Sequence, residues 1–89
     1  MITSQTVSSF WSFYGELPIE AKKAARKAYK LWRQNPFYPS LKFKCVKQQE
    51  NIWSLRVSEG HRALCIFEGP TVTWFWIGDH DSDMRLIRS

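Results

Sequence analysis

The sequence predicts an α+β fold in which two N-terminal helices pack on one face of a four-stranded antiparallel sheet. Apolar residues recur at helical spacing up to about residue 34, whereas apolar and polar residues alternate from residue 41 onward. Short polar turns separate the alternating segments, which is typical of an antiparallel meander. Because each helix has to bury its apolar stripe, we expect both helices to cover the same face of the sheet.

Length and composition favour one compact domain over residues 1–89. The hydrophobic fraction of 44% and the aromatic fraction of 16% are enough for a dense core and argue against disorder. The net charge of +5 favours a polyanionic partner, such as nucleic acid, an anionic membrane or an acidic protein, or simply a lysine-rich soluble surface. We expect a cytoplasmic protein with no membrane partner, because no signal peptide is evident and the longest apolar run, residues 74–77, cannot span a bilayer.

A first helix is predicted over residues 3–16, with Thr3 or Ser4 as its cap. Residues 1–2 could begin a short edge strand before it. The apolar positions of this helix recur at helical spacing: Val7, Phe10, Tyr14 and Leu17.

The second predicted helix spans residues 18–34, where Ala, Lys, Arg and Leu dominate, and Pro18 suits its first turn. Asn35 and Pro36 end it. One side is apolar and consists of Ala21, Ala24, Ala25, Ala28, Leu31 and Trp32. The opposite side is basic and consists of Lys22, Lys23, Arg26, Lys30 and Arg33. Such a basic side is usually solvated, but it could also contact RNA phosphates.

Four strands are predicted over residues 41–45, 53–57, 62–67 and 71–77, and the tail at residues 82–87 could form one helical turn. In the first of these strands Lys42 and Lys44 alternate with apolar neighbours and should leave the same side. The cysteines, Cys45 and Cys65, form no C-x-x-C pair, and we expect both to be buried free thiols.

The sequence offers little for a metal or cofactor site. His61 and His80 are far apart in the chain, and the acidic residues Asp79, Asp81 and Asp83 near His80 lack the glutamate that completes a calcium loop. No glycine-rich phosphate loop and no Cys-His nucleophile pair is present. We therefore expect neither a metal nor a cofactor.

A group of basic side chains is predicted to meet at one rim of the sheet. Arg56 ends the second strand, His61 and Arg62 open the third, and His80 follows the fourth. In a meander these strand ends share an edge. Such a group suits metal-free RNA cleavage, in which a base deprotonates the 2′-OH, an acid protonates the leaving 5′ oxygen and cations hold the phosphate. Arg62 and Arg56 would bind the phosphate, and His80 would transfer a proton.

Each of these assignments has a structural alternative. Arg56 could pair with a nearby carboxylate, and both histidines could be ordinary turn or loop residues. The carboxylates available to Arg56 are Glu59, Glu68 and Asp79. The tryptophans of the strands are expected in the core rather than in a base-stacking platform: Trp53, Trp74 and Trp76.

The order of several short motifs resembles that of the RelE/ParE family of toxins. W-S-L-R-V at residues 53–57, followed by G-H-R-A-L at residues 60–64, resembles the central hairpin of that family, and especially its YoeB-like branch. Residues 24–36 and 39–42 are similar to the family's second helix and to the start of its sheet. Residues 76–81 resemble its last strand and C-terminal functional tail, so that the resemblance spans roughly residues 7–87.

The resemblance implies the toxin of a type II toxin–antitoxin pair, neutralised by a cognate acidic antitoxin in a hetero-oligomer. It further implies a metal-independent endonuclease that cuts mRNA on the ribosome. By position, Arg62 matches the phosphate-binding arginine of these RNases, and His80 matches a catalytic histidine of the YoeB-like branch. Arg56 completes the expected catalytic set. The expected RNA contacts are Lys42, Lys44, His61 and Arg85.

The chain departs from the RNases of that family at three places. Asp81 stands where the YoeB-like branch has a tyrosine, Ile52 and Ser54 stand where RelE has lysines, and residues 38–40 offer no clear match to a catalytic glutamate. Two alternatives therefore stay open. One is a ParE-like poison of DNA gyrase, and the other is a non-catalytic module that binds nucleic acid or an antitoxin.

Overall fold

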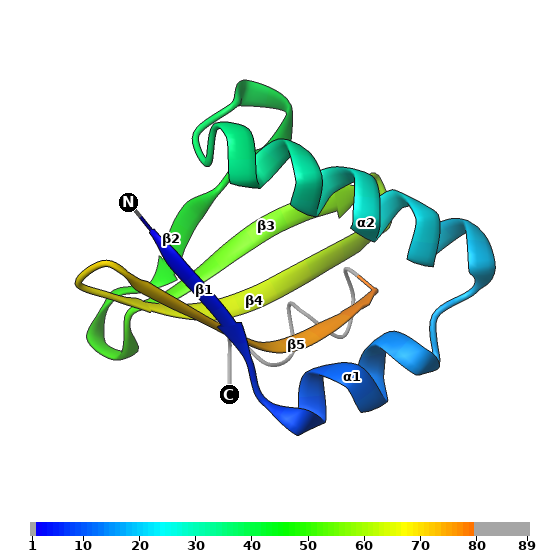
Figure 1. The fold of residues 1–89 in the computed structure, drawn as a ribbon, viewed down its shortest axis with the longest axis horizontal. Helices are drawn as coiled ribbons and strands as arrows, with labels where there is room; N and C mark the ends of the chain where they lie inside the picture. Colours follow the sequence, from blue (N-terminus) through cyan, green and yellow to red (C-terminus); the bar gives the residue numbers. More distant parts are fainter. Residues whose placement is uncertain (1, 80–89) are drawn as a thin grey trace.

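A computed structural model describes residues 2–79 and shows two helices against one face of a twisted sheet (Figure 1). The helices are α1 (Ser8–Gly15) and α2 (Ile19–Gln34), and the strands are β1 (Thr3–Thr6), β2 (Lys44–Lys47), β3 (Ile52–Ser58), β4 (His61–Glu68) and β5 (Thr71–Asp79). Two 3₁₀ turns, Pro39–Leu41 and Gln48–Glu50, flank β2. The predicted α+β fold with both helices on one face is confirmed. The helical turn predicted at residues 82–87 lies outside the described residues.

The sheet differs from the prediction in one strand. Its order is β1-β5-β4-β3-β2, and the four strands from β2 to β5 form the predicted antiparallel meander. β1 adds a fifth strand, which lies parallel to β5 and pairs residues 3–6 with residues 71–74. The sheet is therefore five-stranded and mixed rather than four-stranded and antiparallel.

The prediction of helix over residues 3–16 is wrong for its first part. Residues 3–6 form strand β1, and the helix begins at Ser8 after Val7, whose backbone is extended. The strand forms because β5 supplies backbone partners and because Ser4 meets side chains of the core. The Ser4 Oγ accepts hydrogen bonds from the Tyr29 hydroxyl at 2.9 Å and from the Trp74 Nε1 at 3.1 Å. The sequence left open a short edge strand beginning at residues 1–2, and the strand that forms is Thr3–Thr6.

The first strand of the meander also begins later than predicted. Pro39–Leu41 is a 3₁₀ turn, and Lys42 has a left-handed backbone with φ 45°, so regular alternation starts only at Lys44. The prediction of two buried thiols holds for Cys65 and is wrong for Cys45, which is exposed. Cys45 is exposed because β2 is an edge strand, while α2 packs mainly on β3.

The core lies between the sheet and the helices. Leu55, Ala63 and Ile77 form one cross-strand row on β3, β4 and β5, and all three are buried. The buried residues of α2 that pack over this face are Ala21, Ala25, Ala28 and Trp32. The small alanines let α2 approach the sheet closely, and Trp32, only 1% exposed, meets Trp74 edge-on at 5.2 Å between ring centroids. Of the strand tryptophans, Trp74 and Trp76 are buried and Trp53 is half-buried.

Helix α1 lies beside β5, where β1 no longer pairs with that strand (Figure 1). The Ser9 hydroxyl donates to the Phe75 carbonyl at 3.3 Å, and Phe13 contacts the Trp76 ring with 6.2 Å between centroids. The helix thus covers the end of β5 that carries the candidate site. Within residues 2–79 neither helix combines the length and the apolar character needed to cross a membrane.

Candidate functional site

Two arginines face each other across β3 and β4. Arg56 pairs directly with Arg62, and Arg62 pairs on its other side with Gly78 of β5. Successive side chains of a strand point to opposite faces, and the neighbours of these arginines, Leu55 and Ala63, belong to the helix-covered core. The Arg56 and Arg62 side chains therefore leave the face that the helices do not cover.

The guanidinium of Arg62 is fixed by the turn that joins β3 to β4. Its Nη1 donates to the carbonyl oxygen of Ser58 at 2.9 Å and to the carbonyl oxygen of His61 at 3.0 Å. Both acceptors are neutral, so these bonds orient the side chain without cancelling its charge. A planar guanidinium held in this way is suited to bind a phosphate through its remaining N–H groups.

Within residues 2–79 neither arginine forms an ion pair with a carboxylate. Within that range, Arg56 therefore does not form the ion pair that the sequence left open as an alternative, with Glu59, Glu68 or Asp79. Like charges directly opposite each other on neighbouring strands destabilise a sheet. An anion bound between Arg56 and Arg62 would relieve this repulsion, and the pair therefore has the electrostatics of an anion site.

His61 lies at the same rim, as the meander topology predicted. It pairs with Ser58 on one side and with Asp79 on the other, and its Nδ1 lies 3.4 Å from the Ser58 Oγ. The structure thus brings Arg56, Arg62 and His61 together at the ends of β3 and β4. His80 follows Asp79 directly in the chain, but it lies outside the described residues, as does Arg85.

The two lysines predicted to contact RNA differ in their placement. Lys44 pairs with Ser54, two residues before Arg56, so Lys44 lies on the same face as the arginines and one row away. Lys42 lies in the left-handed turn before β2 and does not belong to the strand. Both lysines are exposed. The face opposite the helices therefore carries three cations in adjacent rows: Lys44, Arg56 and Arg62.

Of the two free cysteines, Cys45 is exposed and Cys65 is buried. Burial raises the pKa of the Cys65 thiol to about 12, so this cysteine stays protonated near neutral pH. Within residues 2–79, no three side chains of the metal-binding types, His, Cys, Asp or Glu, come together. The groups that the structure places at the rim are the guanidinium groups of Arg56 and Arg62, the imidazole of His61 and the carboxylate of Asp79.

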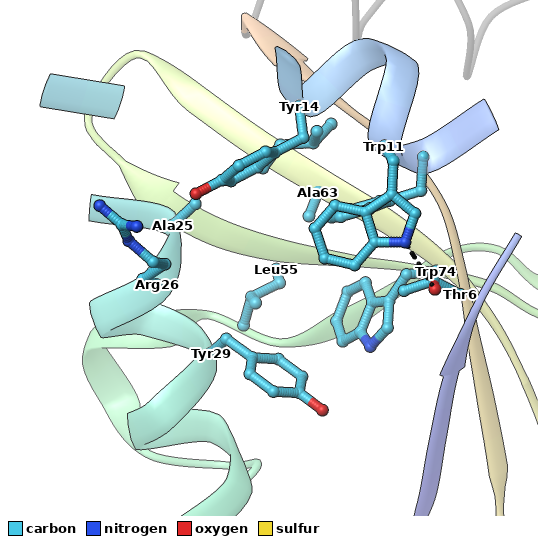
Figure 2. Close-up of a pocket in the computed structure, with 11 residues that line it drawn as sticks. Thr6, Trp11, Tyr14, Ala25, Arg26, Tyr29, Leu55, Ala63 and Trp74 are labelled. Atoms are coloured by element: carbon cyan, nitrogen blue, oxygen red, sulfur yellow. Dashed lines mark hydrogen bonds between the residues drawn. The ribbon is translucent and has the colours of Figure 1, made fainter. Parts of the chain in front are cut away.

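A second feature, which the sequence pattern did not predict, is an apolar groove between α1 and α2 (Figure 2). It has a volume of about 480 Å³, and its floor includes Leu55 and Trp74 of the sheet. Trp11 and Tyr14 of α1 face Arg26 and Tyr29 of α2 across it. The Trp11 side chain is 56% exposed although its Nε1 donates to the Thr6 Oγ1 at 3.0 Å. The excess of aromatic residues in α1 was the sequence signal for this groove.

The two rims of the groove differ in charge. Helix α1 carries no charged residue, whereas Lys22 and Arg26 of α2 lie beside the aromatic rings. The Lys22 Nζ lies 5.9 Å from the centroid of the Tyr14 ring, which joins the two helices through a cation–π contact. The groove is thus apolar at its floor and positive along its α2 side.

Comparisons with known proteins agree with this architecture. The ParE-like toxin domain family matches residues 20–82. The YoeB/ParE toxin from Agrobacterium tumefaciens superposes with a TM-score of 0.66 at 16% identity, covering 89% of this chain and 99% of that toxin. The RelB–RelE antitoxin–toxin complex from Methanococcus jannaschii contains a chain with a TM-score of 0.69 at 17% identity, covering 92% of this chain and 96% of that one. A search among curated proteins found no match.

These likenesses in structure fall below 25% identity and show the fold, whereas the family match spans most of the sequence. It includes α2 from Glu20 onward and every strand of the meander, and with them Arg56, His61 and Arg62. The chain therefore belongs to the RelE/ParE superfamily of toxins, as a protein with a ParE-like toxin domain.

Proposed function

We propose that this protein is the toxin of a type II toxin–antitoxin pair and that it cleaves mRNA on the ribosome without a metal. The observation that carries the proposal is the pair formed by Arg56 and Arg62, which face each other without a carboxylate partner in residues 2–79. An anion bound between two like charges at such a position would relieve their repulsion, and the phosphodiester of RNA supplies one.

In this proposal the arginines hold the scissile phosphate. The ribose 2′ hydroxyl gives its proton to a water molecule as its oxygen attacks the adjacent phosphorus. The bond from phosphorus to the 5′ oxygen then breaks, and the products are a 2′,3′-cyclic phosphate and a 5′-hydroxyl. Arg62, which the turn carbonyls orient, and Arg56 stabilise the charge that develops on the phosphate oxygens. His80 is proposed to transfer a proton to the leaving oxygen. The proposed RNA contacts outside this centre are Lys42, Lys44, His61 and Arg85.

The proposed partner is a cognate acidic antitoxin. The relative from Methanococcus jannaschii was solved as a complex of antitoxin and toxin. In this chain the groove between α1 and α2 offers an apolar floor and a positive rim, which suits an amphipathic segment that has carboxylates along one side. The net charge of +5 favours an acidic partner over a second copy of the chain. The proposed place of action is the cytoplasm, where the mRNA is translated.

The test is induced expression in bacterial cells, with mapping of the 5′ ends of mRNA. The proposal expects new 5′-hydroxyl ends within translated regions shortly after induction. A variant that combines Arg62→Ala with His80→Ala should lose both cleavage and toxicity while remaining folded. The control is Lys23→Ala, a change at an exposed lysine that lines none of the pockets in residues 2–79 and should cleave normally. Growth arrest with intact messages would contradict the proposal.

The ParE-like description of the matching family favours a second candidate, a poison of DNA gyrase. This activity needs surface contacts and no proton transfer by His80. A supercoiling assay with purified gyrase separates the two candidates. If the His80→Ala variant still inhibits supercoiling, the result supports the gyrase poison. If the unaltered protein leaves supercoiling unimpaired and cleaves mRNA, the result supports the nuclease.

A further inference from the structure

Arg56 also lines a pocket at the edge of β3 that faces away from β4, between this strand and α2. β2 pairs with β3 only as far as Ser54, so the end of β3 has no strand partner on that side within residues 2–79. α2 and the 3₁₀ turn at Pro39–Leu41 approach this open edge and enclose a pocket of about 340 Å³. Arg56 thus belongs both to the cross-strand pair with Arg62 and to the lining of this pocket.

The pocket has a cationic rim and an apolar floor. Lys27 of α2 and Arg56 provide two positive charges, and Glu59 provides one negative charge. Within residues 2–79 neither Lys27 nor Arg56 forms an ion pair, and Lys27 is exposed. The floor is formed by the aliphatic side chains of Leu31, Leu41 and Val57. The Ser40 side chain adds a hydroxyl.

This combination fits a nucleotide better than a free anion. The aliphatic floor offers a surface for a ribose or a base, while the rim offers cations for a phosphate and a hydroxyl that can donate a hydrogen bond. A folded partner protein could supply an acidic side chain to the same cations. However, Arg56 lines the pocket and also pairs with Arg62 across the strands, which favours one polyanionic strand that contacts both sites.

We infer that the pocket between α2 and the open edge of β3 binds the nucleotide next to the scissile phosphate of a single-stranded RNA. Lys27 and Arg56 hold the neighbouring phosphate, and Arg56 is shared between the two successive phosphates. The inference rests on the proposed function, because it extends the RNA path from the arginine pair around the edge of the sheet. It assigns a role to Lys27 of α2, which does not belong to the basic side defined from the sequence.

The test measures how RNA binding depends on salt. The probe is a short fluorescent single-stranded RNA with methylated 2′ hydroxyls, which cannot be cut by attack of the 2′ oxygen. Each phosphate contact contributes about 0.7 to the slope of the logarithm of affinity against the logarithm of salt concentration. Lys27→Gln should lower that slope by about 0.7. The matched control is Lys23→Gln on the same helix, which should leave the slope unchanged because Lys23 faces Glu20 at 4.0 Å and does not line the pocket.

The outcomes separate this inference from the proposed function. If Lys27→Gln and Lys23→Gln change the slope equally while Arg62→Gln weakens binding, the pocket subsite is overturned and the arginine pair stands. If the unaltered protein does not bind the RNA, both proposals fail. If Lys27→Gln weakens binding of a polyglutamate peptide as strongly as binding of RNA, the pocket is a site for acidic protein and the RNA subsite is overturned. Both lysines are exposed, so neither variant should impair folding, and thermal melting verifies this.

Discussion

Replacing Gly78 by alanine tests how the last strand supports the candidate site. Gly78 lies opposite Arg62, and the indole of Trp76 occupies the space above it. A Cβ at residue 78 would lie 2.5 Å from Cζ2 and 2.9 Å from Cη2 of that indole, well inside normal contact distance. The indole cannot easily move aside, because Trp76 is only 6% exposed and its ring contacts Phe13.

The expected cost is that of an overpacked core, about 1–3 kcal/mol of unfolding free energy. Without the clash, Gly→Ala would stabilise the chain by about 0.4–1 kcal/mol through the unfolded state. The assay is urea denaturation of Gly78→Ala made in the natural sequence and in a Trp76→Leu background. The penalty should disappear in that background, because the smaller side chain vacates the space. An equal penalty in both backgrounds would refute the steric explanation.

Two further outcomes concern the half-buried Ser4 hydroxyl and the buried Cys65 thiol. Ser4→Ala should lower the unfolding free energy by about 1–3 kcal/mol, because the Trp74 indole N–H loses its acceptor in the core and the Tyr29 hydroxyl loses its partner as well. Thermal or urea denaturation measures this, and Ser12→Ala at an exposed position of α1 should have little effect. Burial raises the pKa of Cys65 from 9.0 to about 12, so the folded state keeps a proton that the unfolded state loses, and stability falls between these pH values. Between pH 8 and pH 10 the protein should lose about 1.4 kcal/mol more than a Cys65→Ala variant, and parallel pH profiles would contradict this.

The parts of the fold that could be predicted are those in which local pattern and tertiary packing agree. The second helix was predicted at residues 18–34 and found at Ile19–Gln34, because its alanine-rich stripe both favours helix and fits against the sheet. The meander was predicted because each pair of neighbouring strands is joined by a short polar turn. Strand β1 could not be predicted in the same way. Its pairing with β5 joins residues 3–6 to residues 71–74, and no local pattern encodes a contact so distant in the chain.

The candidate site was likewise predicted only where local pattern and tertiary structure agree. The topology of a meander is enough to place Arg56 beside Arg62 and His61 at one rim, and the structure has this arrangement. Lys42 was misplaced because alternation of residue types continues through Lys42 while the backbone there is left-handed. The groove between the helices was not predicted, since it depends on the angle between α1 and α2 rather than on either sequence segment alone.

The proposed partner site and the proposed RNA site lie on opposite faces of the sheet, and residues of α2 line pockets near both. The groove for an acidic partner opens on the helix-covered face, whereas Arg56 and Arg62 leave the other face. A partner seated only in the groove would not cover the arginine pair. However, Arg26 lines the groove and Lys27, the next residue, lines the pocket that also contains Arg56. An acidic segment that follows the basic side of α2 out of the groove would therefore meet the same cations as the RNA. Neutralisation could then proceed by competition for Lys27 and Arg56, and a partner would not have to reach Arg62 at all.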